Sequence, residues 1–280
     1  MSNTTRGASY TFNINNLANK DSQYKYGMRP LMYSMKKNKG WERCGHNIHY
    51  FENHVAKTAE SGTYNTLSFQ TVFDFDDDEV YFAQNYPYTY TDLMSYLARI
   101  TGPANQKKVR AQPLCTTLAG NEALTLLITD FDKEPAVIAK REGIVLTARV
   151  HSGGSQASYV MEGTIDFLIG STKEARFLRE NFVFKIVPMI NIDGVINGNT
   201  RSSLAGLDLN RQYHGGERQA PEINALRAMM DSTREAGRNM FMYCDFHGHS
   251  TAKNLFLFGC HNNYSGPDVM RERIFPLLFH

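Results

Sequence analysis

Four runs of mostly consecutive apolar residues limit this chain to folds with a sheet buried on both faces. The runs lie at residues 124–129, 144–150, 182–187 and 240–246. None of them alternates strictly between apolar and polar side chains, as a strand with one face in water does. Helical patterns lie at 91–100, 157–169 and 221–236. This order predicts an α/β domain with a mixed, largely parallel central sheet and flanking helices.

The first ninety residues have a different texture. Short runs rich in Tyr, Phe, Thr and Val lie at residues 10–14, 47–51, 67–73 and 80–83. Alternating runs of this composition are typical of half-buried antiparallel strands. The sequence therefore predicts a small antiparallel β-sandwich domain over residues 1–87, followed by the α/β domain over residues 88–280.

The composition argues against several classes of partner. The chain has 280 residues, and its formal net charge of +2 is too small to indicate nucleic acid or an anionic membrane surface as a partner. No apolar run has the length of a transmembrane helix, and the first residues lack the apolar core of a signal peptide. The four cysteines are scattered without a CxxC spacing, which favours reduced thiols. We therefore expect a cytoplasmic protein.

Two histidines follow two of the buried strands. His151 comes directly after the run at 144–150, and His247 ends the run at 240–246. Because the carboxyl ends of parallel strands meet at one edge of a sheet, both imidazoles are expected in one crevice. Asp245, two residues before the second histidine, either orients that ring or merely ends the strand. A lone histidine after a strand is more often structural, but this pair indicates a metal site.

A polar loop at residues 191–216 is expected beside the two histidines. A structureless segment of that length in a compact domain is usually functional or disordered, and its apolar anchors favour an ordered, functional loop. It contains Arg201, Asp208, Asn210 and Arg211. The arginines could simply hold the loop together, but two guanidiniums beside an amide favour recognition of a carboxylate, which a guanidinium fork binds through two hydrogen bonds.

The ordered motifs of the chain resemble those of a known family, the zinc carboxypeptidases, and within it the cytosolic carboxypeptidases that trim glutamates from tubulin and other proteins. The matching segments cover nearly the whole chain. They are residues 26–31, 40–43, 88–93, 114–120, 184–189, 193–199, 204–211 and 245–250. The resemblance implies a zinc-dependent metallocarboxypeptidase that removes C-terminal amino acids, glutamates above all, with acidic protein tails such as polyglutamylated tubulin as partners.

The resemblance also implies roles for individual residues. His151 and His247 match the two histidine ligands of the zinc ion, and Asp208 matches the carboxylate that orients the first of them. Arg201 matches the residue that polarises the scissile carbonyl. The resemblance further implies that the substrate's terminal carboxylate is bound by Arg201, Asn210 and Arg211.

Two departures from the family pattern put catalysis by this chain in question. The family run His-Pro-Gly-Glu-Thr supplies a glutamate as third zinc ligand, whereas this chain has Gly154 at that position. The family's general-base glutamate belongs to a C-terminal portion that this sequence does not contain, and the first strands of the β-domain are also expected to be missing. Three readings follow: an impaired zinc carboxypeptidase, a pseudopeptidase that binds acidic C-terminal tails, or a truncated product without function.

Overall fold

The computed structural model describes residues 1–57, 62–260 and 270–279. These residues divide into two compact units, Met1–Gly248 and His249–His280. The central sheet and every candidate site residue belong to the first unit. In the second, a 3₁₀ turn at Arg271–Arg273 leads into the short helix α7 at Ile274–Phe279. Part of the predicted second domain, residues 261–269 and 280, lies outside the described residues.

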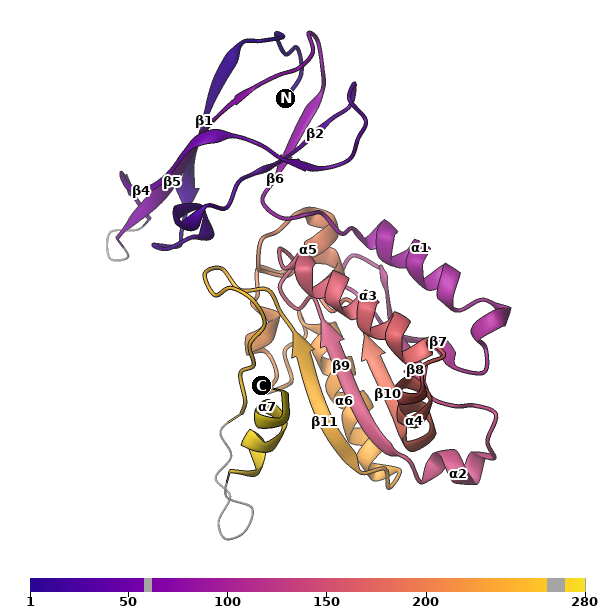
Figure 1. Ribbon diagram of the computed structural model, residues 1–280. Helices are drawn as coiled ribbons and strands as arrows, with labels where there is room; N and C mark the ends of the chain where they lie inside the picture. The colour runs from indigo at the N-terminus through magenta and orange to yellow at the C-terminus, as the bar shows by residue number, and fades with distance from the viewer. Residues whose placement is uncertain (58–61, 261–269, 280) are drawn as a thin grey trace. The chain divides into compact units, whose positions relative to one another are not determined.

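The central sheet has five strands in the order β11-β9-β10-β8-β7 (Figure 1). Their bounds are Val109–Thr116 for β7, Glu122–Ile128 for β8, Glu142–Ala148 for β9, Phe182–Val187 for β10 and Met240–Phe246 for β11. Strand β9 pairs in parallel with both β10 and β11, whereas β8 runs antiparallel to β10 and β7. The predicted mixed α/β sheet is confirmed.

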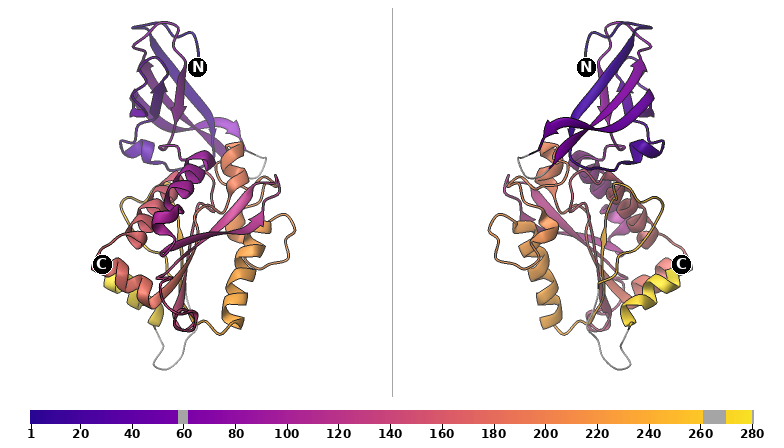
Figure 2. Two further views of the ribbon diagram at one scale, coloured as in Figure 1. Left: turned by 90° about the vertical axis from the view of Figure 1, so that its right-hand side faces the viewer. Right: turned by 90° about the vertical axis from the view of Figure 1, so that its left-hand side faces the viewer.

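Helices cover both faces of this sheet (Figures 1 and 2). Helices α1 (Tyr90–Ile100) and α3 (Ser155–Ile169) pack on the face that carries Ile144 and Leu146. Helix α6 (Pro221–Glu235) packs on the opposite face, against Val145 and Val187. Because successive side chains of a strand point to opposite faces, a strand buried on both sides must be apolar at nearly every position. This arrangement explains the apolar runs of β8, β9 and β10, whereas β11, at the edge of the sheet, is half-buried or exposed at every position.

The helix ends follow local signals in the sequence. Thr89 and Asp92 form a reciprocal capping box at the start of α1, and Pro221 occupies the first turn of α6, where its missing amide hydrogen costs nothing. Three shorter helices complete the α/β domain. They are α2 at Pro135–Ala139, α4 at Lys173–Asn181 and α5 at Ile192–Asn197.

The segment 191–216 is more regular than the single long loop expected from the sequence. It begins with helix α5, whose N-cap Asn191 accepts a hydrogen bond from the amide of Gly194, and it contains a 3₁₀ turn at Leu209–Arg211. The sequence shows no sign of α5 because a six-residue helix has too few turns to show a helical period. The candidate residues thus lie on short, anchored elements.

The N-terminal region consists of two three-stranded antiparallel sheets. The first has the order β1-β5-β4 (Ser9–Leu17, Thr63–Val72 and His46–Ala56), and the second has the order β3-β2-β6 (Glu42–Arg43, Leu31–Ser34 and Val80–Ala83). Phe69 and Phe82 bring the sheets together, with ring centroids 5.5 Å apart. The antiparallel region matches the expectation, while the domain boundary at residue 87 stays a prediction.

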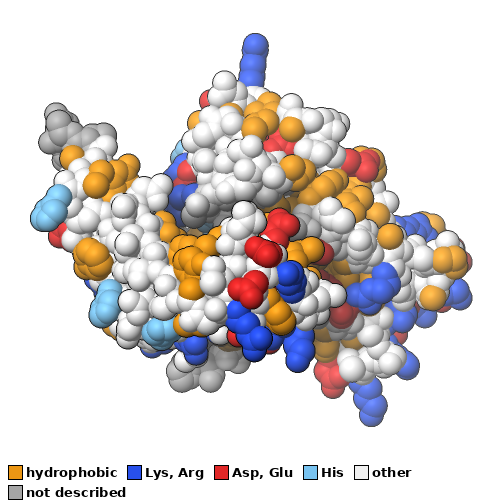
Figure 3. All heavy atoms as spheres, turned by 90° about the horizontal axis from the view of Figure 1, so that it is seen from above, with side chains coloured by type: hydrophobic (Ala, Val, Ile, Leu, Met, Phe, Trp, Pro, Cys, Tyr) orange, Lys and Arg blue, Asp and Glu red, His pale blue; other side chains and the backbone are white. Residues whose placement is uncertain are grey.

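Charged side chains of both signs are mixed on the face seen in Figure 3, as the small net charge leads one to expect. In the part of the chain that the structure describes, none of the helices combines the length and the apolar character needed to cross a bilayer.

Candidate functional site

The turn that carries His151 is held by an arginine at the end of β9. Arg149 has a φ of 60°, an uncommon conformation for a side chain other than glycine. Its buried guanidinium donates to the carbonyl oxygens of Ser152, at 2.8 Å, and Tyr88, at 3.1 Å, and to the hydroxyl of Ser158, at 2.9 Å. These bonds tie the turn to helix α3 and to the residues before α1, so the backbone that carries the His151 ring is held in place.

Gly153 brings this turn into direct contact with the 191–216 segment. Its amide donates to the carbonyl oxygen of Thr200 at 2.7 Å. A Cβ at this position would lie only 2.5 Å from the same oxygen, so no other residue fits without moving the backbone. The close approach places the histidine turn beside the segment that contains Asp208.

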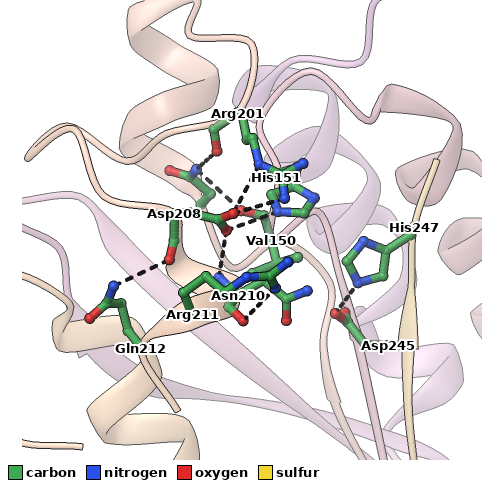
Figure 4. Close-up of polar contacts among 10 residues, drawn as sticks. Val150, His151, Arg201, Asp208, Asn210, Arg211, Gln212, Asp245 and His247 are labelled. Atoms are coloured by element: carbon green, nitrogen blue, oxygen red, sulfur yellow. Dashed lines mark hydrogen bonds and ion pairs between the residues drawn. The ribbon is translucent and has the colours of Figure 1, made fainter. Parts of the chain in front are cut away.

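Asp208 lies between His151 and Arg201 (Figure 4). Its Oδ1 contacts His151 Nε2 at 3.0 Å, and its Oδ2 accepts from Nε and Nη2 of Arg201 at 2.9 and 2.8 Å. The amide of Asn210 also donates to Oδ1, at 3.0 Å. Because one carboxylate holds a ring, a guanidinium and a backbone amide, the three groups form one rigid network.

The electrostatics of this network favour a neutral ring beside an ionised carboxylate. Burial lowers the pKa of His151, and the nearby Arg201 acts in the same direction against the opposing effect of Asp208. Burial alone would raise the pKa of Asp208, but the hydrogen bonds from His151 and Arg201 outweigh it and lower the pKa. An ionised carboxylate can only accept, so the ring donates through Nε2 and its Nδ1 keeps a free lone pair.

His247 is held in the same manner by Asp245, at the end of β11. The Nε2 atom of the ring contacts Asp245 Oδ2 at 2.5 Å, and the other carboxylate oxygen accepts from the hydroxyl of Thr147 at 2.7 Å. Of the two readings left open for Asp245, the structure shows the ring contact. The rings of His151 and His247 lie with their centroids 5.2 Å apart, so the two histidines are neighbours, as the strand ends lead one to expect.

Arg201 and Arg211 present guanidinium groups to solvent. Arg201 is 55% exposed although Asp208 engages one edge of it. Arg211 is exposed, and its Nη1 donates to the carbonyl oxygen of its neighbour Asn210, at 3.2 Å. Of the three residues expected to bind a carboxylate, Arg201 pairs with Asp208 directly, Asn210 bonds to it through its backbone amide, and Arg211 belongs to the 3₁₀ turn that follows (Figure 4).

The comparisons with known proteins agree with the motifs. The family model for zinc carboxypeptidases matches residues 93–270. The chain belongs to the zinc carboxypeptidase family. Cytosolic carboxypeptidase 2 of Mus musculus is 42% identical over 284 residues, which cover 99% of this chain and 32% of the mouse protein. Cytosolic carboxypeptidase 4 of Homo sapiens is 44% identical over 269 residues, which cover 90% of this chain and 24% of the human protein.

The resemblance to the cytosolic carboxypeptidases is confirmed by these identities, and the chain spans a third or less of the length of these relatives. Among solved structures, a putative carboxypeptidase A from Shewanella denitrificans OS-217 has a TM-score of 0.74 at 23% identity, covering 94% of this chain and 63% of its own. A metallo-carboxypeptidase from Burkholderia cenocepacia has a TM-score of 0.68 at 22% identity, covering 89% and 60%. These two show the shared fold.

The described residues do not supply a complete ligand set for the zinc ion that the family name implies. A catalytic zinc takes three protein ligands and a water molecule. His151 and His247 offer two ring nitrogens, Gly154 offers no side chain, and both nearby aspartates are engaged by the rings. Within residues 1–57, 62–260 and 270–279, no group of three or more His, Cys, Asp and Glu residues could hold a metal ion.

The backbone nevertheless leaves room for the missing carboxylate. Gly154 has a φ of −82°, which any residue adopts. A Cβ built there would lie 3.3 Å from the carbonyl oxygen of His151 and 3.7 Å from the amide nitrogen of Gly248. The absence of a third ligand is therefore a matter of the side chain, since the fold at this position still accepts a larger one.

Three residues of the site carry no signal that would single them out in the sequence. Thr147, Tyr213 and Tyr243 form a chain of hydroxyl groups that ends on Asp245. A threonine and a tyrosine inside apolar strands usually pack as β-formers, so their polar contacts become visible only with the strand register. Tyr213 lies two residues after the 204–211 motif, but that position alone does not indicate a polar contact with a strand.

Proposed function

We propose that this chain recognises the free α-carboxylate of acidic C-terminal tails without hydrolysing the terminal peptide bond. The proposed partners are cytoplasmic proteins with glutamate-rich tails, polyglutamylated tubulin among them. The observation that carries the proposal is a glycine at position 154, close to a segment at residues 191–216 that carries Arg201, Asn210 and Arg211.

The charges of the segment support recognition of an anion. Arg201 and Arg211 supply two guanidiniums, and Asp208 is the carboxylate that offsets one of them. Arg201 uses Nε and Nη2 for that ion pair, which leaves its remaining donors for a ligand, while Arg211 is exposed. A guanidinium fork binds a carboxylate through two parallel hydrogen bonds, and Asn210 adds an amide donor nearby.

The ligand count supports the loss of hydrolysis. A zinc-bound water becomes a nucleophile at neutral pH only when the metal is held firmly with one open position. Two ring nitrogens are a weaker set than the two histidines and one carboxylate of the family pattern. Binding of the tail requires none of these ligands, because the arginines and Asn210 lie on a separate segment.

The decisive experiment compares two fluorescent peptides that end in the same run of glutamates, one with a free α-carboxylate and one amidated. We expect the free acid to bind more tightly, and Arg211→Ala to weaken binding about 10-fold, at the lower end for a charge-assisted hydrogen bond because the side chain is exposed. Arg234→Ala, which removes an equal charge from the last turn of α6, is the matched control. Equal affinity for both peptides would refute the proposal.

Hydrolysis is the second candidate function, and the imidazole pair favours it. His151 and His247 are each held through Nε2 by a carboxylate, which leaves both Nδ1 atoms on the side away from those contacts. Release of glutamate from the free-acid peptide, measured with zinc added and with a chelator present, separates the two candidates. Zinc-dependent turnover would establish a peptidase, and its absence together with tight binding would establish recognition alone.

A further inference from the structure

A chain of hydroxyl groups links His247 to the segment at residues 191–216. Tyr213 Oη lies 2.9 Å from Tyr243 Oη, which lies 3.0 Å from Thr147 Oγ1, and this hydroxyl donates to Asp245 Oδ1 at 2.7 Å. The second carboxylate oxygen contacts His247 Nε2 at 2.5 Å. Four contacts in series therefore connect a residue of the segment to the second ring.

The strand register explains how these groups come together. Asp245 pairs with Thr147 across the parallel strands β11 and β9, and Tyr243 pairs with Val145. Side chains two residues apart in a strand point to the same face, so Tyr243, Asp245 and Thr147 share the face on which Val145 packs. The same face holds Leu209 and Tyr213 in its apolar cluster. The segment is thus placed where its tyrosine meets the strand hydroxyls.

Counting hydrogens fixes the direction of every bond in the chain. A carboxylate only accepts, so Thr147 spends its single hydroxyl hydrogen on Asp245. Its oxygen must then accept from Tyr243, and the oxygen of Tyr243 must accept from Tyr213. By the same rule, His247 donates to the carboxylate through Nε2.

The tyrosines remain donors over the whole working range of pH. Burial raises the pKa of Tyr243 to about 12, and burial also raises the pKa of Tyr213. Thr147 is fully buried, and the side chain of Asp245 is 12% exposed, so water has little access to the carboxylate end of the chain. A buried carboxylate with two aimed donors has one preferred orientation.

We propose that Tyr213, Tyr243 and Thr147 are positioning residues that orient Asp245 and hold His247 as the Nε2–H tautomer. The same segment then controls both rings, because Asp208 holds His151 directly and Tyr213 acts on His247 through the hydroxyl chain. This role holds for a tail-binding protein and for a peptidase alike, and does not depend on the proposed function.

The test is NMR spectroscopy of the histidine side chains in ¹⁵N-labelled protein, at a pH where the rings are neutral. His247 is assigned by its loss in His247→Gln. In the wild type we expect the Nε2–H tautomer to exceed the other by at least about 10-fold, given the strength of a charge-assisted hydrogen bond. We also expect a nuclear Overhauser effect between the two rings, whose centroids lie 5.2 Å apart.

Substitutions then separate orientation from packing. Thr147→Val keeps the shape of the side chain but removes its hydroxyl, so we expect the nuclear Overhauser effect between the two histidine rings to be lost. Thr147→Ser keeps the hydroxyl and should keep this effect. Tyr243→Phe should act like the valine variant. Tyr90→Phe, which removes a hydroxyl that donates to the carbonyl oxygen of Glu122, should change nothing.

Two results would overturn the proposal. One is a wild-type His247 that carries its proton on Nδ1 or exchanges freely between tautomers. The other is a folded Thr147→Val protein whose ring-to-ring effect equals that of the wild type. Beyond the His247→Gln variant that assigns the signal, the wild-type tautomer needs no substitution in the hydroxyl chain, so the first result decides even if Thr147→Val or Tyr243→Phe prevents folding.

Discussion

Restoring a carboxylate at position 154 is the most direct perturbation of this site. The Gly154→Glu side chain starts from an ordinary φ of −82°, and its Cβ has neighbours at 3.3 and 3.7 Å, so only a few tenths of an ångström of adjustment are needed. It also stands at the N-terminus of α3, where a negative charge is favourable by roughly 0.3–1 kcal/mol. We therefore expect the variant to fold like the wild type.

The gain in zinc affinity should be large. Loss of an outer residue that merely orients a metal ligand costs 10–100-fold in affinity, so a new direct ligand should contribute at least about 100-fold, or roughly 2.7 kcal/mol. Competition with a chromophoric chelator measures both dissociation constants. Zinc-dependent thermal unfolding provides a second measurement, because a ligand at 100 times its dissociation constant stabilises the folded state by about 2.7 kcal/mol.

Two variants control for size and charge. Gly154→Gln adds a side chain of the same length without the anionic ligand, and Gly163→Glu adds the same charge to the middle of α3, where a Cβ has no neighbour within 4 Å. Both should bind zinc like the wild type. Tight, near-stoichiometric zinc in the wild type, unchanged by Gly154→Glu, would refute the reasoning about the missing ligand.

Three further predictions concern stability. Burial raises the pKa of Glu222 to about 7, above the usual 4.5, so its contribution to the stability of the folded state is lost as the pH rises through 7. Glu222→Gln should therefore raise the free energy of unfolding by on the order of 3 kcal/mol at about pH 8. Urea titrations should show no gain below pH 4.5. The lowered pKa of Asp208 implies the opposite trend: Asp208→Asn should destabilise the protein at neutral pH, and calorimetry should show this difference shrinking as the pH falls below about 3.9. Leu126→Ala, at a fully buried position, should cost about 2–5 kcal/mol in urea, and a smaller loss would mean that the core there collapses around the cavity.

The apolar pattern predicts four strands of the central sheet and misses the edge strand β7. The predicted bounds of β10 and β11 agree with the structure, and in β10 most of the apolar run is buried. Strand β7 was not predicted, because most of its side chains are exposed and it contains Pro113, which a central strand excludes. The other edge strand, β11, was predicted because its run is apolar at most positions, although none of its residues is fully buried.

The candidate site, too, could be predicted from the sequence only in part. Motif order alone indicates that His151, Asp208 and His247 belong together, and the contacts between them are found in the structure. The hydroxyl chain could not be predicted, because the link from Tyr213 to Thr147 depends on strand register and on how the segment packs. Neither property leaves a mark on one sequence.

The close approach at Gly153 also suggests how often this site opens. Its amide hydrogen is bonded to the carbonyl oxygen of Thr200 at 2.7 Å, and the two backbones lie too close together for a side chain to fit between them. Exchange of that single hydrogen with solvent deuterium therefore requires the histidine turn and the arginine-bearing segment to separate. The hydrogen-exchange rate of the Gly153 amide would therefore report how often the two segments separate, and it can be measured without ligand, metal or turnover.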